Sequence, residues 1–579
     1  MPTSSKHIGI VTASSADTIM ARIDGLETFE GQKANLQVGR YLKIAEGNTD
    51  FVIAVIRNVK GSSAPVDGKL AWTFDIECQP VGTLVNGTAF SRGSTLLPVP
   101  TEPVFPVARE TLDLVFKADA RFNYALALLS MNKQIDLMID GDGFFGKHIA
   151  IVGSTGSGKS STVARILQDI VGIDSGINRN IKAQRNSHIV IFDIHAEYRR
   201  AFTLKEDQAF TLNVLDVDTL ALPYWLMNAE ELESLFIESN EQNSYNQVSQ
   251  FKHAVIANKE KHNQSVRDMT YDCPVYFSIE EVQRYIENVN KEVIGKEPGE
   301  NVPKLSDKTL IKTREDYYFD KVHDFFPSSQ AKDAKASNGP FYGEFNRFAS
   351  RLQTTLSDKR LGFLLRATKP DGKPYGTLDF EEIVKQFLGY LNKSNVTIID
   401  LSGIPFEVMS IVVSLVSRLV FDFCFHYSKV RHAENGLNDV PVMIVCEEAH
   451  NYVPQSDVAA YRSSRKSIER IAKEGRKYGL SLMIVSQRPS EVSETIFAQC
   501  SNFLSLRLTN SNDQAYVANL IPNNARSITD VLPSLDQGEC VVVGDAALIP
   551  AIVRMHCLIR NLNLTASMCT GNGSKCGGM

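Results

Sequence analysis

The chain has 579 residues, of which 43% are hydrophobic, enough for about three or four domains with substantial cores. Its formal net charge of −6 excludes a globally basic nucleic-acid binder, although a ring or groove can be locally basic on an acidic protein. The nine cysteines show no Cys-x-x-Cys spacing and the start MPTSSKHIGIV lacks the pattern of a signal peptide, so we expect a cytoplasmic protein with reduced thiols.

Short alternating segments fill residues 7–95, among them IGIVTA, TIMARID, LQVGRYLKIA and DFVIAVIRNV. Glycine, asparagine and aspartate separate these segments, which is typical of a small antiparallel barrel or sandwich. Residues 94–109 then hold a cluster of prolines. Because proline cannot donate to a β-ladder, we expect an extended connector there. We assign an N-terminal β-barrel to residues 1–100.

The pattern changes near residue 146. KHIAIVG is a continuous apolar run typical of a buried parallel strand, and KSSTVARILQDIV after it has helical spacing. Strands that alternate with helices predict a doubly wound α/β core, which we assign to residues 101–228 and 389–562. Similar apolar runs recur within residues 187–198, 395–403, 441–450, 480–489 and 503–508.

Between the two core segments, residues 229–388 carry polar helical stretches and charged loops, and we expect a mostly helical insertion there. The apolar stretch 409–425 contains Arg418 and Asp422 and is short for a membrane span. We therefore expect a buried helix and no membrane partner. The C-terminal tail, residues 563–579, has little to bury and is expected to be flexible.

The stretch GSTGSGKS, residues 153–160, lies between the apolar strand and its helix and matches the phosphate-binding pattern GxxxxGK[ST]. Its glycines let backbone N–H groups turn toward phosphate oxygens, and the helix N-terminus adds partial positive charge. We expect Lys159 to contact the terminal phosphates of ATP and the Ser160 hydroxyl to bind Mg²⁺. The expected nucleotide contacts are Gly153, Ser154, Thr155, Gly156, Ser157, Gly158, Lys159, Ser160 and Ser161.

An acidic pair, Glu447 and Glu448, follows the apolar strand MIVC. We expect Glu447 to support the Mg²⁺ shell, where such motifs usually carry aspartate, and Glu448 to orient and polarise the attacking water. Gln487, at the end of the next strand, is a candidate for sensing the γ-phosphate. Asp193 and Glu197 end another strand toward the same crevice, where a catalytic role and a structural role are both open.

Basic residues gather just before the strand that leads to Gln487. Ring ATPases present a residue at this place to the nucleotide of the neighbouring subunit, and we favour Arg476 as such an arginine finger. A merely solvated helix face is the alternative. A second basic group after the acidic pair is open to two interpretations, phosphate contacts in a pore and a solvated face. The first group comprises Arg470, Lys473, Arg476 and Lys477, and the second comprises Arg462, Arg465 and Lys466.

Five stretches in order resemble the HerA branch of the HerA/FtsK superfamily of ring-forming P-loop ATPases: HIAIVGSTGSGKSS, IFDIHAEY, LPYWLMNAEEL, IIDLSGIPFEV, and VCEEAHNYVP with RIAKEGRKYGLSLMIVSQRPSEVS. The late LDQGECVVVGDAALIP is similar to the C-terminal strand pair of that family, so the resemblance covers nearly the whole chain. It implies a RecA-like core with an N-terminal barrel of the HAS type and a helical insertion. One departure is Lys147, near a position where relatives can have an arginine that reaches across the interface, because lysine lacks the planar fork.

The resemblance further implies a homohexameric ring that hydrolyses ATP between subunits with Mg²⁺ and moves double-stranded DNA through its pore. It also implies that the barrel docks an effector, such as a nuclease or, in anti-phage defence, a sirtuin-like NAD-consuming protein. A second hypothesis is a hexameric scaffold that assembles and activates the effector without obligatory translocation. A third, a conjugation-type coupling ATPase, is disfavoured because such a protein would normally have a membrane anchor.

Overall fold

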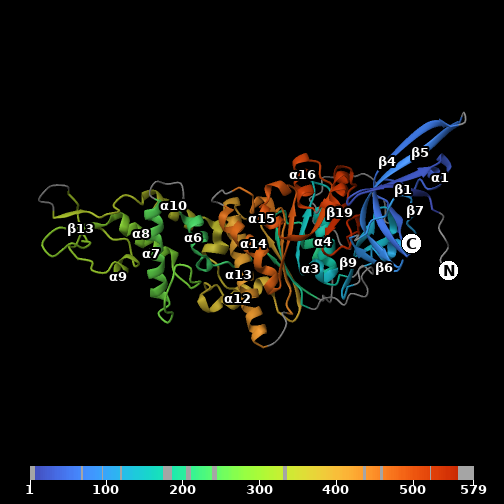
Figure 1. The fold of residues 1–579 in the computed structure, drawn as a ribbon. Coiled ribbons are helices and arrows are strands. Elements are labelled where there is room, and N and C mark those ends of the chain that lie inside the picture. Colours follow the sequence, from blue (N-terminus) through green and yellow to red (C-terminus); the bar gives the residue numbers. More distant parts are fainter. Residues whose placement is uncertain are drawn as a thin grey trace, which may run out of the picture.

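The computed structural model of the chain shows an elongated molecule (Figure 1). A β-barrel lies at one end, an α/β core in the middle and a largely helical lobe at the other end. The tail at 563–579 lies outside the residues that the structure describes. Those residues are 7–47, 49–66, 69–93, 96–117, 120–173, 186–203, 210–237, 244–329, 335–434, 439–456, 461–521 and 523–558.

The N-terminal strands form a closed antiparallel barrel, as expected. The strand order is β2-β1-β7-β3-β4-β5, and a pairing between β2 and β5 closes the circle, with β6 added outside β5. Alternate residues point inward to an apolar core that includes Ile19, Ile44 and Ile76. The strands are β1 (Gly9–Ser14), β2 (Ile19–Asp24), β3 (Tyr41–Glu46), β4 (Asp50–Val66), β5 (Lys69–Val85), β6 (Ala89–Arg92) and β7 (Pro103–Pro106).

Strand β7 corrects the expected connector at residues 94–109. It pairs with β1 on one side and β3 on the other, and Val104 is fully buried in the barrel. Pro103 and Pro106 stand at the two ends of the strand, where no interior N–H is lost. The barrel therefore takes its last strand from beyond the boundary that we placed at residue 100.

One eleven-stranded sheet forms the core, in the order β12-β15-β11-β16-β17-β10-β18-β19-β20-β8-β9. Neighbours run parallel from β12 to β18 and antiparallel from β18 to β9. Each apolar run named above forms a parallel strand, which confirms the predicted doubly wound core. The strands are β8 (Asn123–Leu129), β9 (Asn132–Asp140), β10 (His148–Val152), β11 (His188–Asp193), β12 (Phe210–Leu215), β15 (Ser394–Asp400), β16 (Val442–Cys446), β17 (Leu480–Ser486), β18 (Cys500–Leu506), β19 (Glu539–Gly544) and β20 (Ala551–Met555).

Helices cover both faces of this sheet. Ile149 and Ile151 of β10 share one apolar cluster with α4 (Lys159–Ile170). The alternate residues Ala150 and Val152 belong to a second cluster, with α13 (Phe406–Ala433) and α14 (Arg462–Glu474). The P-loop strand is therefore buried from both sides, which fixes the position of the loop that follows it.

Helix α13 contains the apolar stretch that we expected to be buried. By length and composition alone it could cross a membrane, but 78% of its most apolar window is buried inside the protein. Its apolar residues pack against β15 and β16 and against α14, as in the core helix of a globular domain. The expectation of a buried helix is confirmed.

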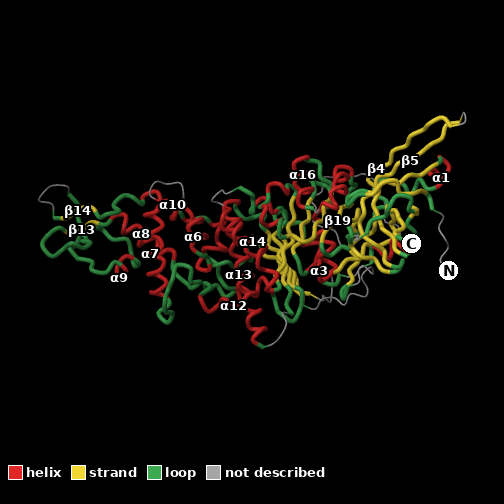
Figure 2. The backbone as a smooth tube through the Cα atoms, viewed as in Figure 1, coloured by secondary structure: helices red, strands yellow, loops and turns green. Residues whose placement is uncertain are grey.

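The segment between β12 and β15 forms the lobe at the far end of the molecule. Figure 2 shows it as helices and loops with the short strands β13 and β14 at its far end, whereas the other strands lie in the core and the barrel. Its inner helices share the apolar cluster of the core face covered by α13. The helices are α6 (Ala229–Phe236), α7 (Ser244–His262), α8 (Ile279–Lys291), α9 (Glu315–Tyr318), α10 (Asn346–Ser357), α11 (Gly362–Leu365) and α12 (Phe380–Leu388), with a hairpin of β13 (Val293–Gly295) and β14 (Ala336–Asn338).

Short helices complete the barrel and the core. They are α1 (Leu26–Gly31), α2 (Arg109–Val115), α3 (Gly141–Phe145), α5 (Arg199–Phe202), α15 (Glu494–Phe497) and α16 (Ser511–Leu520).

Candidate nucleotide-binding site

The P-loop connects the buried end of β10 to the start of α4. Gly156 and Gly158 have φ values of 74° and 103°, which side chains rarely adopt, so glycine is required at both turns. A Cβ atom on Gly153 would lie 2.7 Å from Ser157 Oγ and 2.8 Å from Leu506 Cβ. The loop thus has the strand–loop–helix geometry of an anion cradle, with the N-terminus of α4 pointing into it.

Lys159, the first residue of α4, is only 5% exposed, and its Nζ lies 3.4 Å from the Ser154 carbonyl oxygen. Burial lowers the pKa of Lys159, and the carboxylates of Glu448 and Glu447 oppose this shift. A lysine held between a phosphate-binding loop and two acids can exchange these contacts for phosphate oxygens.

Glu447 follows β16 and is 3% exposed. Its Oε1 accepts hydrogen bonds from Ser160 Oγ at 3.0 Å and from the Tyr198 hydroxyl at 2.8 Å. Burial, with the charge of Glu448, raises the pKa of Glu447 to about 7. Its other oxygen, Oε2, is buried and has no hydrogen-bond partner among the described residues. A hydroxyl beside a carboxylate with an unused oxygen is a donor set that suits Mg²⁺.

Glu448 is the next residue, in the left-handed region at φ 47°. The Gln487 side-chain amide donates to Glu448 Oε1, and Gln487 Oε1 accepts from Thr155 Oγ1 of the P-loop. His450 Nδ1 lies 3.5 Å from Glu448 Oε2. One amide therefore joins the candidate base to the phosphate-binding loop, at the place where a γ-phosphate would lie against both.

Asp193 and Glu197 make different interactions in the structure. The buried Asp193 carboxylate accepts hydrogen bonds from the backbone N–H groups of His195, Glu197 and Tyr198. It thereby shapes the turn that brings Tyr198 to Glu447. Burial raises the pKa of Asp193, and these hydrogen bonds oppose the shift. The negative charge of Glu197 acts on Lys159, where it opposes the lowering of the lysine pKa by burial.

Arg476 does not lie in the pocket of its own chain. It belongs to the short turn Gly475–Tyr478, which precedes the start of β17, whereas the P-loop follows the end of the parallel strand β10. The two places are separated by the length of a seven-residue strand, about 20 Å. Arg476 is exposed. Lys147, on the same edge, pairs with Asp545 at 2.7 Å.

The second basic group is mostly paired with acids in this chain. Arg465 Nε lies 2.8 Å from Glu469 Oε1, and Lys466 contacts Glu230. Arg462 starts α14. The structure therefore provides no cluster of free cations at these three positions, and the two interpretations of the sequence remain open.

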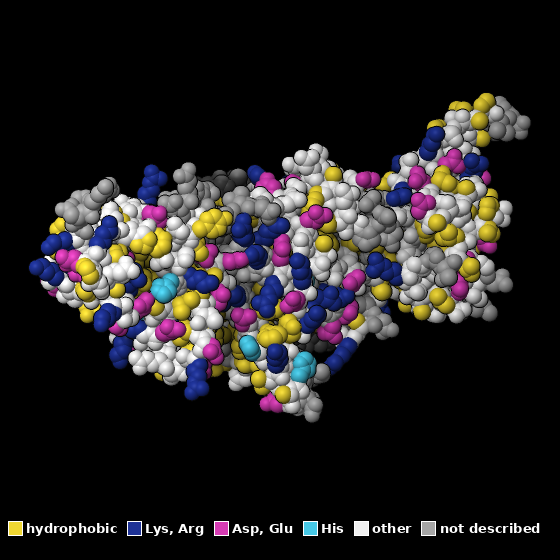
Figure 3. All heavy atoms as spheres, turned by 60° about the vertical axis from the view of Figure 1, so that its left-hand side comes forward, with side chains coloured by type: hydrophobic (Ala, Val, Ile, Leu, Met, Phe, Trp, Pro, Cys, Tyr) yellow, Lys and Arg dark blue, Asp and Glu magenta, His cyan; other side chains and the backbone are white. Residues whose placement is uncertain are grey.

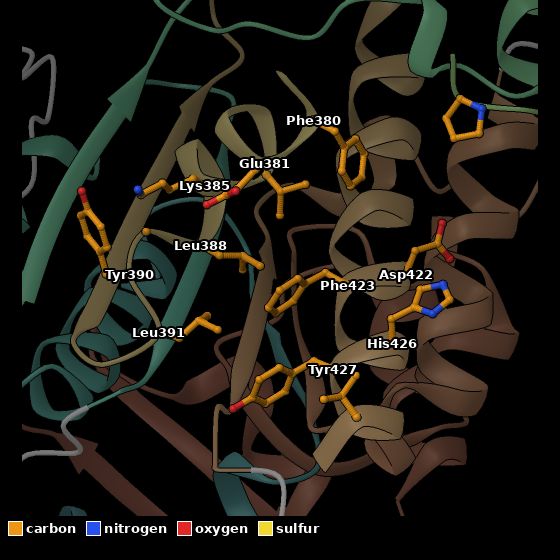
Figure 4. A pocket seen from close by; sticks show the side chains of 14 residues that line it. Phe380, Glu381, Lys385, Leu388, Tyr390, Leu391, Asp422, Phe423, His426 and Tyr427 are labelled. Carbon is orange, nitrogen blue, oxygen red and sulfur yellow. The ribbon is translucent and has the colours of Figure 1, made fainter. Parts of the chain in front are cut away.

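Two of the cavities among the described residues lie near or beside the core. One of about 550 Å³ opens next to Glu448 and Gln487 and is also lined by His450, Arg488 and Glu491. It has room for water and for a side chain from outside. The other, of about 800 Å³, lies between α12 and α13, away from the P-loop, and its lining is largely apolar (Figure 4).

The structure brings together the P-loop residues that we expect to contact the nucleotide, the acidic pair and Gln487. Two residues of the site were not predicted, Tyr198 and His450. Both lie close to predicted acids in the sequence, Tyr198 immediately after Glu197 and His450 two residues after Glu448. That adjacency is the signal that could have identified them.

Comparison with known proteins gives a consistent result. The family model for the central domain of the helicase HerA matches residues 126–420. A DNA double-strand break repair helicase HerA from Pyrococcus furiosus is 23% identical over 90% of this chain and 88% of its own length. The protein of the same name from Sulfolobus acidocaldarius is 26% identical over 79% of this chain and 74% of its own length. Among solved structures, VirB4 of Thermoanaerobacter pseudethanolicus aligns with a TM-score of 0.44 and 12% identity, over 75% of this chain and 96% of that chain.

Proposed function

The chain belongs to the HerA helicase family, and from this premise we propose that it is an ATP-driven motor acting on double-stranded DNA. The resemblance seen in the sequence is confirmed by the family match, and with it ATP hydrolysis as the activity of the chain. The relatives from Pyrococcus furiosus and Sulfolobus acidocaldarius bear the name of DNA repair helicases, which supports DNA as the substrate on which the motor acts.

The observation that carries the proposal is the convergence of Ser160, Glu447 and Glu448 on the P-loop. In the proposed mechanism the loop amides and Lys159 would hold the phosphates of ATP, and Ser160 and Glu447, which lie in contact, would hold Mg²⁺. The ion, when bound, neutralises charge that develops on the phosphates. Glu448 accepts a proton from the attacking water, and Gln487 registers whether the γ-phosphate is present through its link to Thr155.

The position of Arg476 supports the proposal of a ring. Because this exposed arginine lies about 20 Å from the nucleotide loop of its own chain, it can act on a nucleotide only in a neighbouring copy. A head-to-tail arrangement that repeats this contact forms a ring when the rotation between neighbouring copies closes. We propose a homohexamer that surrounds duplex DNA and works in the cytoplasm, with Arg476 as the arginine finger.

The N-terminal barrel is the proposed docking site for an effector, a nuclease or a sirtuin-like enzyme, in DNA end processing or anti-phage defence. The barrel lies at the end of the molecule opposite the helical lobe, which leaves its outer surface accessible to another protein (Figure 1). An effector bound there would stand at one mouth of the ring.

The test is the rate of ATP hydrolysis with and without linear double-stranded DNA. A translocating motor is expected to hydrolyse ATP several-fold faster with DNA, and high salt should remove this stimulation because phosphate contacts are screened. The matched control is Glu448→Gln, which reports contaminating ATPase. A rate that DNA leaves unchanged, together with ATP-dependent activation of the effector, would favour the scaffold instead.

A further inference from the structure

The long hairpin of β4 and β5 extends beyond the barrel, and we call this projecting part the arm. Strands β4 and β5 are each 17 residues long, and their far ends project beyond the barrel as a two-stranded ribbon (Figure 1). Strand β3 pairs with β4 only as far as Val55, and β2 pairs with β5 only from Thr73 onward. Within the described residues, the stretch Arg57–Val66 therefore has β5 as its single neighbouring strand.

Aromatic packing around Phe74 holds the base of the arm in place. Phe29 stacks on Phe74 with ring centroids 3.8 Å apart, and Trp72 stacks on the same ring at 6.0 Å. The Phe74 ring also lies across Gly61 of the opposite strand, where a Cβ atom would be 3.1 Å from it. Beyond this aromatic group the side chains at 62–65 of β4 and at 70–71 of β5 are exposed, including Leu70 at 68%. Figure 3 shows the arm standing clear of the body of the molecule.

The register identifies which backbone groups face the open edge of β4. The Trp72 carbonyl oxygen accepts from Gly25 N–H at 2.9 Å, so the backbone of Trp72 faces away from β4. Ser63 lies opposite Trp72, and in an antiparallel pair two opposed residues both face inward or both face outward. The N–H and C=O groups of Ser63, and of Gly61 two residues before it, therefore point to the open edge.

This edge lacks most of the usual protection against pairing. Edge strands are commonly guarded by charged side chains, prolines or bulges. From Gly61 to Ala64 the strand has only glycine, serine and alanine, and a proline follows only at position 65. A two-stranded ribbon is also marginally stable in water, so a third strand would stabilise it.

The same barrel has a second strand edge that pairs with no described strand, on β6, next to which helix α2 lies. Among the described strands of its sheet, β6 alone is a terminal strand, paired only with β5 near Gly82–Val85. The two open edges lie at opposite ends of the long β5 strand, separated by about ten residues or roughly 35 Å, so they cannot meet within one chain. Two such edges on one module fit a head-to-tail contact between copies.

We propose that the open edge of the β4–β5 arm adds to strand β6 of a neighbouring copy, so that the barrels are joined by a continuous intersubunit sheet. This inference rests on the ring of the proposed function and names the contact that links its barrels. The partner is a second copy of this chain, and recognition is by main-chain hydrogen bonds.

A cross-linking experiment tests the pairing. Ser63→Cys and Ser91→Cys are placed in separate copies of the full chain, with Cys557, Cys569 and Cys576 changed to serine. The mixture is expected to give a disulfide-linked dimer of the two variants after mild oxidation, whereas each variant mixed with the serine background gives none. Hydrogen exchange is expected to be at least tenfold slower at the amides of Gly61 and Ser63 in the assembled protein than in diluted monomer.

A variant pair isolates the edge. Ser63→Pro removes an outward N–H without removing a β4–β5 hydrogen bond, and should weaken assembly by about tenfold, while Ser63→Thr keeps the N–H and should assemble normally. An intact ring without the cross-link and without slowed exchange overturns the arm contact alone. Protection that arises only when an effector is added also overturns it. A protein that stays monomeric at every concentration overturns the ring as well.

Discussion

At the scale of single residues, the site is a buried pair of acids beside one buried lysine. Glu447 and Glu448 are adjacent in sequence, yet Glu447 faces Ser160 and Tyr198 while Glu448 faces Gln487. The left-handed backbone at Glu448 produces this divergence, because it turns the second side chain away from the first. The two acids can therefore serve different atoms of one reaction.

Replacing Glu448 tests the proposed base. Glu448→Gln keeps the size of the side chain and removes its ability to accept a proton, so ATP should still bind while hydrolysis falls by about 10²-fold or more. Steady-state turnover and nucleotide titration measure the two effects. Glu491→Gln, in the same cavity, is the control and should keep its turnover. A normal rate in Glu448→Gln would assign the base to another residue.

Removing the P-loop lysine should act on binding. Lys159→Ala takes away the positive charge next to the phosphates, so affinity for ATP should fall by at least about tenfold. Fluorescence titration with a labelled nucleotide measures this. The control is Lys147→Ala, which removes a lysine near the other end of β10. Unchanged nucleotide affinity in Lys159→Ala would contradict the site.

Tyr198→Phe removes one hydroxyl that holds Glu447 and leaves the ring in place. Without this hydrogen bond the carboxylate is less well oriented toward Ser160, so the Mg²⁺ concentration for half-maximal hydrolysis should rise by about three- to tenfold. A magnesium titration of the ATPase rate measures the shift. Tyr461→Phe is the control and should keep the Mg²⁺ dependence of the wild type. The same dependence in Tyr198→Phe would show that the Tyr198 hydroxyl does not orient Glu447.

At the scale of elements, the imidazole of His148 joins β10 to α14 and β17, the two elements on either side of the Arg476 turn. His148 starts β10 and is buried, with Nε2 2.9 Å from the Ala472 carbonyl and Nδ1 3.0 Å from Leu482 N–H. Because Nδ1 accepts, the neutral ring carries its proton on Nε2 and donates to Ala472. The strand that leads to the nucleotide is thereby tied to the end of α14 just before Arg476.

This arrangement predicts a pH dependence of stability. Burial, with a contribution from Arg476, lowers the pKa of His148 to about 4 from 6.5. The folded state therefore disfavours protonation of His148. The neutral imidazole contributes on the order of 3 kcal/mol to the free energy of unfolding; this contribution is complete above pH 6.5 and is lost as the pH falls toward 4. His148→Gln cannot titrate and should give a flatter decline of unfolding free energy over this range. The exposed control His432→Gln should follow the wild type, and equal slopes for all three would refute the role.

Much of the fold could be predicted at this scale, because buried parallel strands appear as unbroken apolar runs and the P-loop has a fixed local pattern. The strand β7 could not, because prolines at 103 and 106 indicate a connector unless their long-range partners are known. Tyr198 was missed for a similar reason. Its position next to Glu197 was the available signal, but the turn that brings its hydroxyl to Glu447 is shaped by three backbone hydrogen bonds to Asp193, and these can be read only from the structure.

At the scale of the whole molecule, the P-loop and Arg476 lie at opposite ends of the parallel strands of one sheet. A mixture of two inactive variants tests whether they meet between copies. Arg476→Ala and Glu448→Gln should each be inactive, but in an equal mixture about one interface in four combines an intact Glu448 with an intact Arg476. ATPase activity should therefore recover in the mixture. No recovery, in rings shown by native mass spectrometry to be mixed, would exclude action of Arg476 on the neighbour.

The order of strands in the core sheet has a consequence for synthesis. The β8–β9 hairpin emerges early from the ribosome, together with the barrel, but it joins the rest of the sheet through β20, which is translated near the end. The barrel can fold while the chain is still growing, whereas the β8–β9 hairpin must wait until β20 has been synthesised. A chain that stops before β20 would thus have the barrel with the β8–β9 hairpin and the parallel part of the sheet, but would lack the strand that pairs with β8 and joins the two.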